Sequence, residues 1–282
     1  MKKFVLIVNA FKDKNLAQAH SLSSYIRTMG GSCRCLVSVD EQENICRVRA
    51  EDIPDDTECI LVLGGDGTLI RAARDTVKCG VPLIGVNMGT LGYLCELETE
   101  SVYEGLELLL HDAYILEERM MICGFKDRAG ISRALNDIVI HRSGALSLVS
   151  LTVYVNGQYL HTFRGDGMII ATPTGSTGYN MSAGGPIVDP KAQLLLLTPI
   201  NSHTLSQKSI VIDAHDEIVV EVDGRHTKHD EAVEVSFDGD RGCRLAVGEC
   251  IRIQKAQECA KIVKCSRISF LEILRKKMQS MH

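Results

Sequence analysis

The chain has 282 residues, 45% of them hydrophobic and 24% charged, so it is long and apolar enough for two globular domains. Its formal net charge of −5 argues against a general nucleic-acid binder, which would carry a basic face. No apolar run approaches the length of a membrane-spanning helix, and no secretory signal is recognisable. Eleven cysteines, an odd number without a Cys-x-x-Cys pair, indicate a reduced cytoplasmic protein. We therefore expect a small-molecule partner, with neither nucleic acid nor membrane bound.

The first part of the chain alternates strand and helix patterns. A helical pattern from Leu16 to Met29 is closed by Gly30-Gly31, and a second helix is predicted over about 100–112. This alternation predicts a parallel sheet with helices on its faces, so residues 1–112 are expected to form a Rossmann-like α/β nucleotide-binding domain. Apolar runs place its strands at residues 3–9, 33–39, 58–63 and 82–87.

The second part reads as short strands and turns. Asn156-Gly157 between two alternating runs predicts a type I′ hairpin. Residues 113–265 are expected to form a mostly-β, sandwich-like domain, and an amphipathic pattern predicts a C-terminal helix over about 266–282. Further strands are expected near residues 131–141, 166–171, 210–213, 217–222 and 232–237.

The most informative segment is Gly64-Gly65-Asp66-Gly67-Thr68, between an apolar strand and a helix-like run. Glycines let the backbone approach a ligand closely, and the first amides of the helix would face an anion, so the pattern indicates phosphate binding. A carboxylate there repels phosphate unless it binds a metal or takes a proton from an attacking hydroxyl. The alternative is that Asp66 only caps the helix.

A second glycine-rich segment runs from Phe163 to Pro186 and combines hydroxyl side chains with the ring of Tyr179 beside an apolar strand. Asn136-Asp137 stands just before the apolar run Ile138-Val139-Ile140. Together with the Asp66 segment, these stretches resemble the NAD kinases, and the likeness extends from the first strand to about residue 240. The second glycine-rich segment is the more specific of the two.

The resemblance implies transfer of the γ-phosphoryl group of ATP to the 2′-hydroxyl of the adenosine ribose of NAD. Asp66 matches the proton acceptor of the family, and a divalent cation such as Mg²⁺ is expected with ATP. Arg71 would face the phosphates, unless it is only a solvated helix residue. The phosphate contacts are expected from Gly64, Gly65, Gly67 and Thr68, of which Gly67 also borders the ribose. By analogy, the C-terminal helix packs on the first domain.

The resemblance also implies a set of NAD contacts in the second domain. Asn136 and Asp137 match the amide and carboxylate that hold the adenosine of NAD, although the family usually has Glu where this chain has Asp137. Alternatively, Asn-Asp only marks a turn at a strand entry. Asp166 would bind the nicotinamide end. The remaining expected contacts are Arg164, Thr174, Thr177, Gly178, Tyr179, Asn180, Met181 and Ser182.

Asp238-Gly239-Asp240 lies where the family often has Asp-Gly-Gln, so Asp240 is expected to reach a neighbouring subunit of a homodimer or homotetramer. Two other functions remain open. One is a lipid kinase that shares the Gly-Gly-Asp-Gly-Thr motif, which the NAD-binding segments disfavour. The other is a non-catalytic NAD(H)-binding regulator, which the retained Asp66 disfavours. Polyphosphate in place of ATP, and NADH in place of NAD, also remain open.

Overall fold

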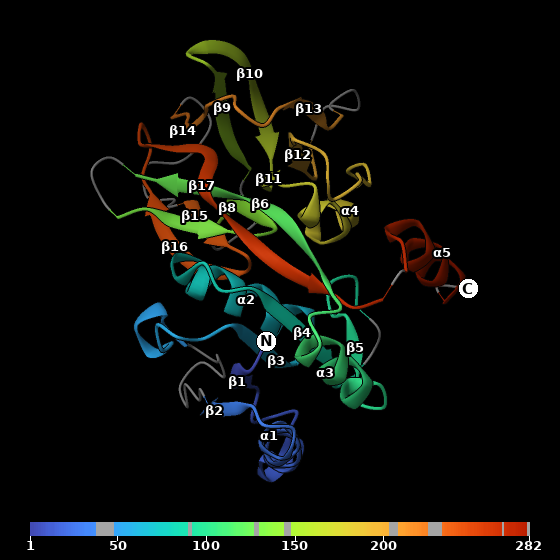
Figure 1. Ribbon diagram of the computed structural model, residues 1–282. Helices are drawn as coiled ribbons and strands as arrows, with labels where there is room; N and C mark the ends of the chain where they lie inside the picture. Colours follow the sequence, from blue (N-terminus) through green and yellow to red (C-terminus); the bar gives the residue numbers. More distant parts are fainter. Residues whose placement is uncertain are drawn as a thin grey trace. The chain divides into compact units, whose positions relative to one another are not determined.

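The computed structural model in Figure 1 describes residues 1–37, 48–89, 92–126, 130–143, 148–202, 208–224, 233–266 and 268–280. Parts of the strands predicted at 33–39 and 232–237, and of the helix predicted at 266–282, lie outside these residues. The chain forms two compact units. Unit 1 comprises Met1–Arg119 and Glu258–His282, and unit 2 comprises Met120–Gln257.

Unit 1 is built on a parallel sheet in the order β4-β3-β1-β2, with β5 and the end of β17 also paired to β4. Its strands are β1 (Lys3–Val8), β2 (Ser32–Val37), β3 (Cys59–Gly64), β4 (Leu83–Asn87) and β5 (Leu97–Glu98). Its α-helices are α1 (Ala17–Thr28), α2 (Asp66–Thr76), α3 (Val102–Leu110) and α5 (Phe270–Ser280), and its 3-10 turns are η1 (Lys14–Leu16), η2 (Ala50–Asp52) and η3 (Val77–Cys79).

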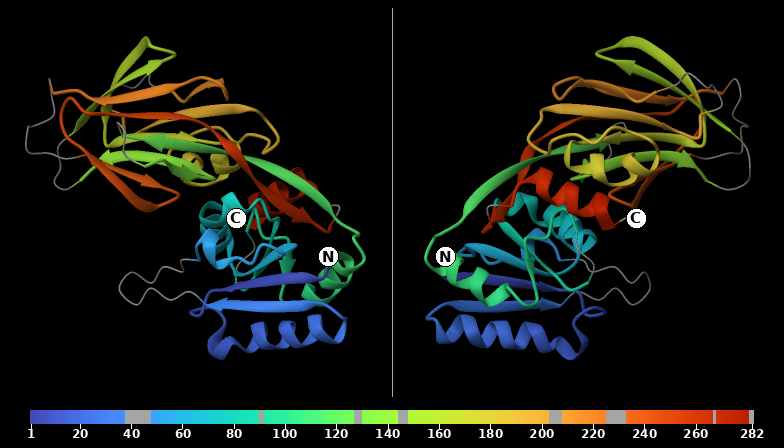
Figure 2. Two further views of the ribbon diagram at one scale, coloured as in Figure 1. Left: turned by 60° about the vertical axis from the view of Figure 1, so that its left-hand side comes forward. Right: turned by 90° about the vertical axis from the view of Figure 1, so that its right-hand side faces the viewer.

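Helices cover both faces of this sheet, as the sequence pattern predicts (Figure 2). Leu22 of α1 and Leu106 of α3 share one core cluster with Leu61 of β3, so α1 and α3 pack on the same face. Leu69 of α2 packs against Gly85 of β4 from the other face; a Cβ on that glycine would lie 2.8 Å from the leucine methyl. Every residue of β3 is therefore buried, which is typical of a parallel strand covered on both sides.

The strand order creates a topological switch point between β1 and β3. From β1 the chain turns to β2 on one side and returns to β3 on the other. In such sheets, ligands bind beyond the carboxyl ends of the strands at the switch point. Asn9, which follows β1, donates from Nδ2 to Thr68 Oγ1 at 3.2 Å, so the segments after β1 and β3 meet there.

The C-terminal helix α5 begins later than the sequence pattern indicates. Ser269 and Glu272 form a capping box, in which the Ser269 amide donates to Glu272 Oε2 at 2.8 Å and the Glu272 amide donates to Ser269 Oγ at 3.3 Å. The helix therefore starts at Phe270, because Ser269 supplies the cap.

Unit 2 contains two sheets with antiparallel pairing. One has the order β10-β9-β14-β17, with β6 paired to β17 and β7, and the other has the order β13-β12-β11-β8-β15-β16. The first comprises β6 (Ile115–Phe125), β7 (Ser132–Ala134), β9 (Val149–Val155), β10 (Gln158–Gly165), β14 (Ile218–Val222) and β17 (Cys250–Lys264), of which β6 and β17 also extend into unit 1. The second comprises β8 (Asp137–Arg142), β11 (Gly167–Ala171), β12 (Leu194–Ile200), β13 (Ile210–Asp213), β15 (Val233–Phe237) and β16 (Asp240–Leu245).

The main core of unit 2 lies between the two sheets. Leu151 of β9 and Val220 of β14 share one cluster with Ile138 of β8 and Ile170 of β11, which are the inward-facing residues of their strands. The outer face of the second sheet carries a smaller cluster that includes Ile169 and Leu196, and Val188 and Ala183 pack against it. The segment that contains η4 (Thr174–Thr177) and α4 (Tyr179–Ser182) is thereby fixed next to the end of β11.

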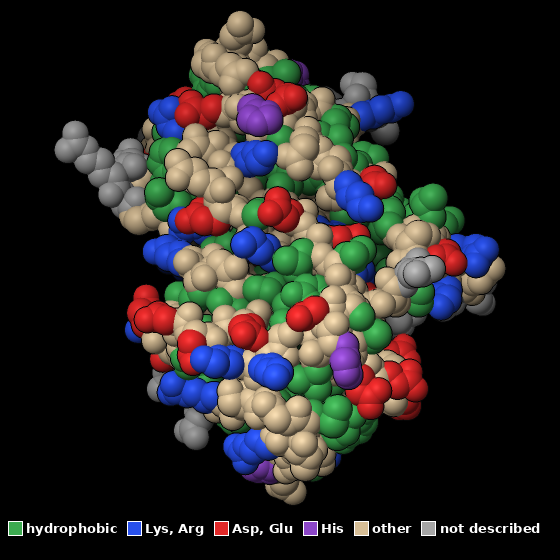
Figure 3. Space-filling view, viewed as in Figure 1, with side chains coloured by type: hydrophobic (Ala, Val, Ile, Leu, Met, Phe, Trp, Pro, Cys, Tyr) green, Lys and Arg blue, Asp and Glu red, His purple; other side chains and the backbone are tan. Residues whose placement is uncertain are grey.

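The predicted fold class is confirmed: a mostly parallel α/β sheet is followed by an antiparallel β domain, with a helix near the C-terminus. The Asn156-Gly157 hairpin is confirmed too, with φ of 52° and 76° at the two turn residues. The strand expected at 131–141 is instead two strands, β7 and β8, interrupted at Leu135-Asn136. No helix in the described residues is long and apolar enough to cross a membrane. On the face drawn in Figure 3, acidic and basic side chains are interspersed.

Candidate functional site

In unit 1, the glycine-rich segment forms the junction between β3 and α2. Gly65 is extended, with φ −148° and ψ −175°, and Asp66 is the first residue of α2. Thr68 is buried and packs against Gly64. A Cβ on Gly64 would lie 2.5 Å from Thr68 Oγ1, so position 64 has no room for a side chain. Gly67 is exposed, and a Cβ there would meet nothing. The segment therefore keeps its backbone open where the first amides of α2 emerge.

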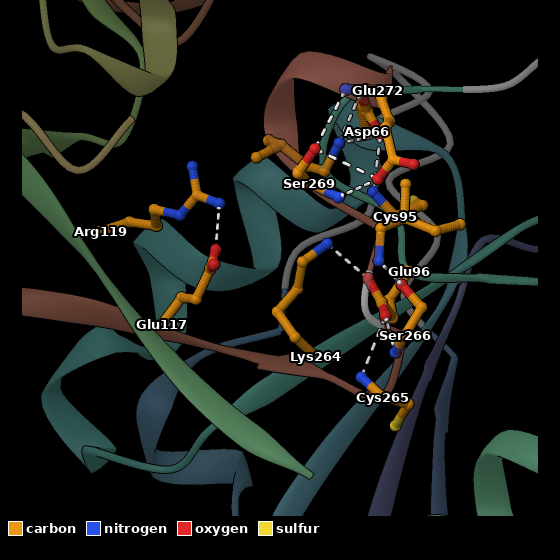
Figure 4. A network of polar contacts seen from close by, with 12 residues as sticks. Asp66, Cys95, Glu96, Glu117, Arg119, Lys264, Cys265, Ser266, Ser269 and Glu272 are labelled. Carbon is orange, nitrogen blue, oxygen red and sulfur yellow. Dashed lines mark hydrogen bonds and ion pairs between the residues drawn. The ribbon is translucent and has the colours of Figure 1, made fainter. Parts of the chain in front are cut away.

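The Asp66 carboxylate is held by the backbone that follows β4 (Figure 4). It accepts the amides of Tyr93 at 2.6 Å, Leu94 at 3.3 Å and Cys95 at 3.1 Å. A Cβ on Gly92 would lie 2.0 Å from Asp66 Oδ1, so glycine is required for this approach. A carboxylate has about four lone-pair sites, so three amides orient Asp66 and still leave acceptor capacity for a ligand hydroxyl.

A lysine stands beside the same segment. A Cβ on Gly65 would lie 2.7 Å from Lys12 Nζ, and a Cβ on Gly89 would lie 3.6 Å from it. The ammonium group therefore lies over the backbone at the carboxyl ends of β3 and β4. It supplies a positive charge where the sequence predicts phosphates.

Two further residues of this region are Arg71, on α2, and Cys95, whose amide bonds to Asp66. Arg71 follows Asp66 by five residues on α2, and its Nε is buried with no hydrogen-bond partner among the described residues. Burial and the nearby Asp66 charge raise the pKa of the Cys95 thiol, so Cys95 stays protonated and is not a reactive thiolate.

The segment that holds Asp66 is itself anchored through Glu96. The Glu96 carboxylate is buried, forms an ion pair with Lys264 at the end of β17, and accepts the amides of Cys265 at 3.0 Å and Ser266 at 2.6 Å (Figure 4). The segment 93–96 is thus held in two ways: its first three amides bond to Asp66, and its Glu96 side chain bonds to Lys264, Cys265 and Ser266. The C-terminal segment of unit 1 therefore supports the backbone that positions Asp66.

In unit 2, Asn136 and Asp137 lie at the turn that enters β8, and their backbone is fixed from two sides. Asp238 accepts the amides of Leu135, Asn136 and Asp137 at 2.8, 2.7 and 3.2 Å. On the other side, Thr172 Oγ1 donates to the Leu135 carbonyl at 2.6 Å, and the Thr172 amide donates to the Asn136 carbonyl at 2.8 Å. The turn interrupts the strand predicted there because its amides bond to a side chain instead of a sheet partner.

Two buried polar atoms at this turn lack a partner in the described chain: Asn136 Oδ1 and Thr174 Oγ1. Buried polar atoms are nearly always hydrogen-bonded, so such a pair is typical of a ligand site. Burial raises the pKa of the Asp137 carboxyl to about 7, and the negative charge of Asp238 adds to this shift. An acceptor with a perturbed pKa beside unpartnered polar atoms marks a candidate binding site.

The segment 174–182 packs directly onto this turn. A Cβ on Gly175 would lie 2.1 Å from the Asn136 carbonyl oxygen, and one on Gly178 would lie 3.4 Å from Asn136 Nδ2 and 3.9 Å from Asp137 Oδ2. Tyr179 begins α4 and is 47% exposed, so its ring is free to stack on a base. The structure thus brings Asn136, Asp137, Thr174 and Gly178 together, and it places Thr177, Tyr179, Met181 and Ser182 on the same short segment.

Asn180 lies in that segment, but its side chain is fully buried. Its Nδ2 donates to the carbonyls of Ser176 at 3.2 Å and Pro186 at 3.0 Å, and its Oδ1 accepts from Thr198 Oγ1 at 2.6 Å. These bonds fix α4 on β12 and occupy most of the amide. A contact of Asn180 with NAD stays a prediction.

Arg164 and Asp166 lie at the other end of β11. Asp137 pairs with Ala171, whereas Gly167 pairs with His141, so Asp166 is about 17 Å along the strand from the turn. Its carboxylate accepts from Arg142 Nε at 3.0 Å and Asn201 Nδ2 at 2.8 Å. Arg164 is exposed on β10. Asp240 begins β16, two residues after Asp238.

No group of three or more His, Cys, Asp or Glu side chains in the described residues could hold a metal ion. Asp66 is the only carboxylate of the glycine-rich segment. One carboxylate next to a phosphate site suits Mg²⁺, which is usually held by one or two carboxylates together with substrate phosphates.

Comparison with known proteins assigns the chain to a family. The ATP-NAD kinase N-terminal domain matches residues 6–114, and the ATP-NAD kinase C-terminal domain matches residues 135–265. The NAD kinase of Agathobacter rectalis is 53% identical over 279 residues, which cover 99% of each chain. The chain belongs to the NAD kinase family. A second NAD kinase, from Lachnospira eligens, is 42% identical and covers 99% of this chain and 100% of its own.

Solved structures of NAD kinases share the fold of this family member. Yeast NADH kinase complexed with NADH matches with a TM-score of 0.80 at 22% identity, over 99% of this chain and 88% of that one. The NAD kinase from Archaeoglobus fulgidus in complex with ATP matches with a TM-score of 0.78 at 22% identity, over 99% of both. The two-domain architecture of the NAD kinases is therefore confirmed for this chain.

The sequence did not point to several residues that shape the candidate site of each unit. Lys12 follows the first strand, so its position beyond the carboxyl end of β1 at a switch point was a usable signal. Asp238 stands about 100 residues from Asn136, and no local pattern links a turn aspartate to a distant strand entry. Gly92 leaves room for the Asp66 carboxylate, and Glu96 bonds to the C-terminal segment of unit 1. Both roles depend on contacts made in the folded chain, and the spacing of these residues from Asp66 forms no recognisable sequence pattern.

Proposed function

We propose that this member of the NAD kinase family transfers the γ-phosphoryl group of ATP to the 2′-hydroxyl of the adenosine ribose of NAD, with Asp66 as the proton acceptor. The chain is accordingly a phosphotransferase, as its close relatives named NAD kinase are. The single observation that carries the proposal is the oriented Asp66 carboxylate at the start of α2, next to the Lys12 ammonium group.

In this proposal, Asp66 takes the proton of the attacking 2′-hydroxyl. A sugar hydroxyl is a poor nucleophile at neutral pH, and base assistance is worth a factor of about 10² to 10⁴. The amides of residues 93–95 fix the direction of the carboxylate, so it need not reorganise during the reaction.

The phosphates of ATP would bind the backbone of Gly64, Gly65, Gly67 and Thr68, with Lys12 and Arg71 as cations. Two observations support this assignment. The ammonium group of Lys12 lies over Gly65. The Nε of Arg71 is buried and has no hydrogen-bond partner in the described residues. Mg²⁺ bound to the phosphates would neutralise the charge that develops on the transferred group. ATP as donor is supported by the Archaeoglobus fulgidus enzyme, whose structure is in complex with ATP.

The adenosine of NAD would bind Asn136 and Asp137, with Thr174 and Gly178 beside them and Tyr179 stacked on the base. The unpartnered Asn136 Oδ1 and Thr174 Oγ1 support this assignment. Thr177, Asn180, Met181 and Ser182 would line the same segment. Arg164 and Asp166 would contact the nicotinamide end, since the strand β11 sets them apart from the adenosine turn. The yeast relative in complex with NADH supports a dinucleotide as acceptor.

We further propose a cytoplasmic homodimer or homotetramer, with Asp240 contributing to a neighbouring site. None of the ten cysteines in the described residues forms a disulfide bond there, which supports a reducing compartment. A lipid kinase sharing the glycine motif is not favoured by any feature of unit 2.

An enzyme assay tests this function. The purified chain is incubated with ATP, Mg²⁺ and either NAD or NADH, and the 2′-phosphorylated product is measured with an NADP-specific dehydrogenase. Diacylglycerol and sphingosine in place of NAD serve as control acceptors. NADP formation without lipid phosphorylation is expected. Binding of NAD without turnover would instead support a non-catalytic regulator.

A further inference from the structure

The β15–β16 turn carries a carboxylate that the proposed reaction does not use. Asp238 is half-buried and has φ of +51°, a conformation that Asp tolerates better than most side chains. Gly239 follows with φ of +84°, so the two residues form the tight turn of the hairpin. This backbone points the Asp238 side chain at the entry of β8.

Four hydrogen bonds join Asp238 to the NAD-binding turn. Its carboxylate accepts three consecutive amides, from Leu135 to Asp137, and its own amide donates to the Asp137 carbonyl at 3.0 Å. Hydrogen bonds to a charged group are stronger than neutral ones. On the side of the turn that faces β15 and β16, the Asp238 carboxylate therefore fixes the backbone of Asn136 and Asp137 in place of a sheet partner.

We propose that Asp238 is a positioning residue for NAD: it holds the Asn136-Asp137 turn in its binding conformation, and its charge limits the pH range in which NAD binds tightly. This inference rests on the proposed role of Asn136 and Asp137 in binding the adenosine of NAD.

The charge effect follows from the surroundings of Asp137. The raised pKa of its carboxyl, about 7, comes first from burial and second from repulsion by Asp238. The paired strand β11 and the turn η4 carry no ionisable side chain. The strand β8 itself ends in His141 and Arg142. Other neighbouring segments carry further ionisable residues, which are Arg133 of β7, Tyr179 of α4, Glu234 of β15, and Asp240, Arg241 and Arg244 of β16. Below about pH 7, Asp137 becomes protonated and loses the charge that accepts hydrogen bonds from the ribose hydroxyls.

The test compares Asp238→Asn, Asp238→Glu and the native chain by NAD titration in a calorimeter at pH 6 and pH 8. Glu234→Gln is the matched control, because Glu234 lies on the same hairpin and pairs with Arg244. A group with a pKa near 7 is about 90% protonated at pH 6, so the native Kd should rise about tenfold from pH 8 to pH 6.

Asp238→Asn should raise the Kd at pH 8 by about tenfold or more, because amides lose a charged acceptor. Its ratio of Kd between pH 6 and pH 8 should be smaller than the native ratio, because the part of the pKa shift that comes from Asp238 is removed while the part that comes from burial remains. Asp238→Glu keeps the charge but is too long to keep all three bonds, so it should raise the Kd and retain the native ratio. The control should leave both values unchanged.

A Kd of Asp238→Asn within twofold of the native value at pH 8, or an unchanged ratio, would overturn the inference. If a thermal melt shows that Asp238→Asn does not fold, Asp238→Glu provides the test instead. A Kd of Asp238→Glu for NAD equal to that of the native chain would then contradict the inference. Native chain that binds NAD with this pH dependence but makes no NADP would refute the proposed function and leave the positioning role of Asp238 intact.

Discussion

Asp66 accepts three backbone amides, and this arrangement limits how it can act on a ribose hydroxyl. The amides come from Tyr93, Leu94 and Cys95, so they approach the carboxylate from one stretch of chain. The hydroxyl must use the lone pairs that face away from that stretch. The same bonds argue against a cap as the only role of Asp66, because its oxygens bond to residues 93–95 rather than to the amides of α2 in the described structure.

Asp66→Asn keeps the size of the side chain but cannot take a proton. We expect turnover to fall by about 10² to 10⁴, with NAD and ATP binding retained. Loss of negative charge next to the phosphates is expected to tighten ATP binding. Turnover and both titrations are measured on one preparation, with Asp75→Asn on the same helix as the control. A fall of less than about tenfold would show that Asp66 is not the proton acceptor.

Tyr179→Ala removes the half-exposed ring at the start of α4. Stacking of a base on an aromatic ring is worth about 1 to 3 kcal/mol, so the Kd for NAD should rise about 5- to 150-fold while the Kd for ATP stays unchanged. Tyr159→Ala, which removes an exposed tyrosine of the β9–β10 hairpin, is the control. An effect confined to ATP would contradict the assignment of this ring to the acceptor nucleotide.

At the scale of elements, the sequence predicted those strands and helices whose pattern is local. The strands β1, β3 and β4 of the parallel sheet are mostly apolar runs, and the Asn156-Gly157 turn has its own signature. Three long strands were missed. Charged residues interrupt the apolar pattern of β6 and β17. In β12, Pro199 stands within the strand and pairs with Met168, although proline is uncommon inside a sheet.

The ends of elements at the site depend on distant contacts, and the sequence does not reveal these. Asp238 binds the backbone amides between β7 and β8 and so separates the two strands. Backbone amides of residues that follow β4 bind the Asp66 carboxylate and so orient it. Motifs in the sequence therefore suggest candidate site residues, whereas the distant groups that position them in the structure leave no local pattern.

The ion pair between Lys264 of β17 and Glu96, which follows the residues that bind Asp66, gives a prediction about stability. Lys264→Met leaves the Glu96 carboxylate buried without its cation; the two side chains are 8% and 2% exposed. Removing one partner of a buried pair costs about 3 to 5 kcal/mol, which urea unfolding would measure. The double variant with Glu96→Gln should recover part of this loss. Lys3→Met, which breaks the exposed pair with Asp56, should have a much smaller effect.

At the scale of the whole molecule, we expect assembly through the surface of unit 2. Its sheets end in β10, β13 and β16, and exposed strand edges need covering. Tyr159 and Val211 are 60% and 50% exposed on two of these strands. We expect a homodimer or homotetramer by light scattering at micromolar concentration. Val211→Asp should weaken it, whereas Leu271→Asp on α5 should not. A single species of 31.0 kDa for the native chain would contradict this expectation.

The proposed reaction transfers a phosphoryl group from ATP to the 2′-hydroxyl of the adenosine ribose of NAD. The most direct measurement incubates the purified chain with ATP, Mg²⁺ and NAD, and then quantifies ADP and locates the new phosphate by phosphorus NMR. We expect one 2′-phosphorylated dinucleotide for each ADP, and no product from the 2′-deoxyadenosine analogue of NAD. ADP without phosphorylated dinucleotide, or phosphate at another hydroxyl, would contradict the proposed reaction.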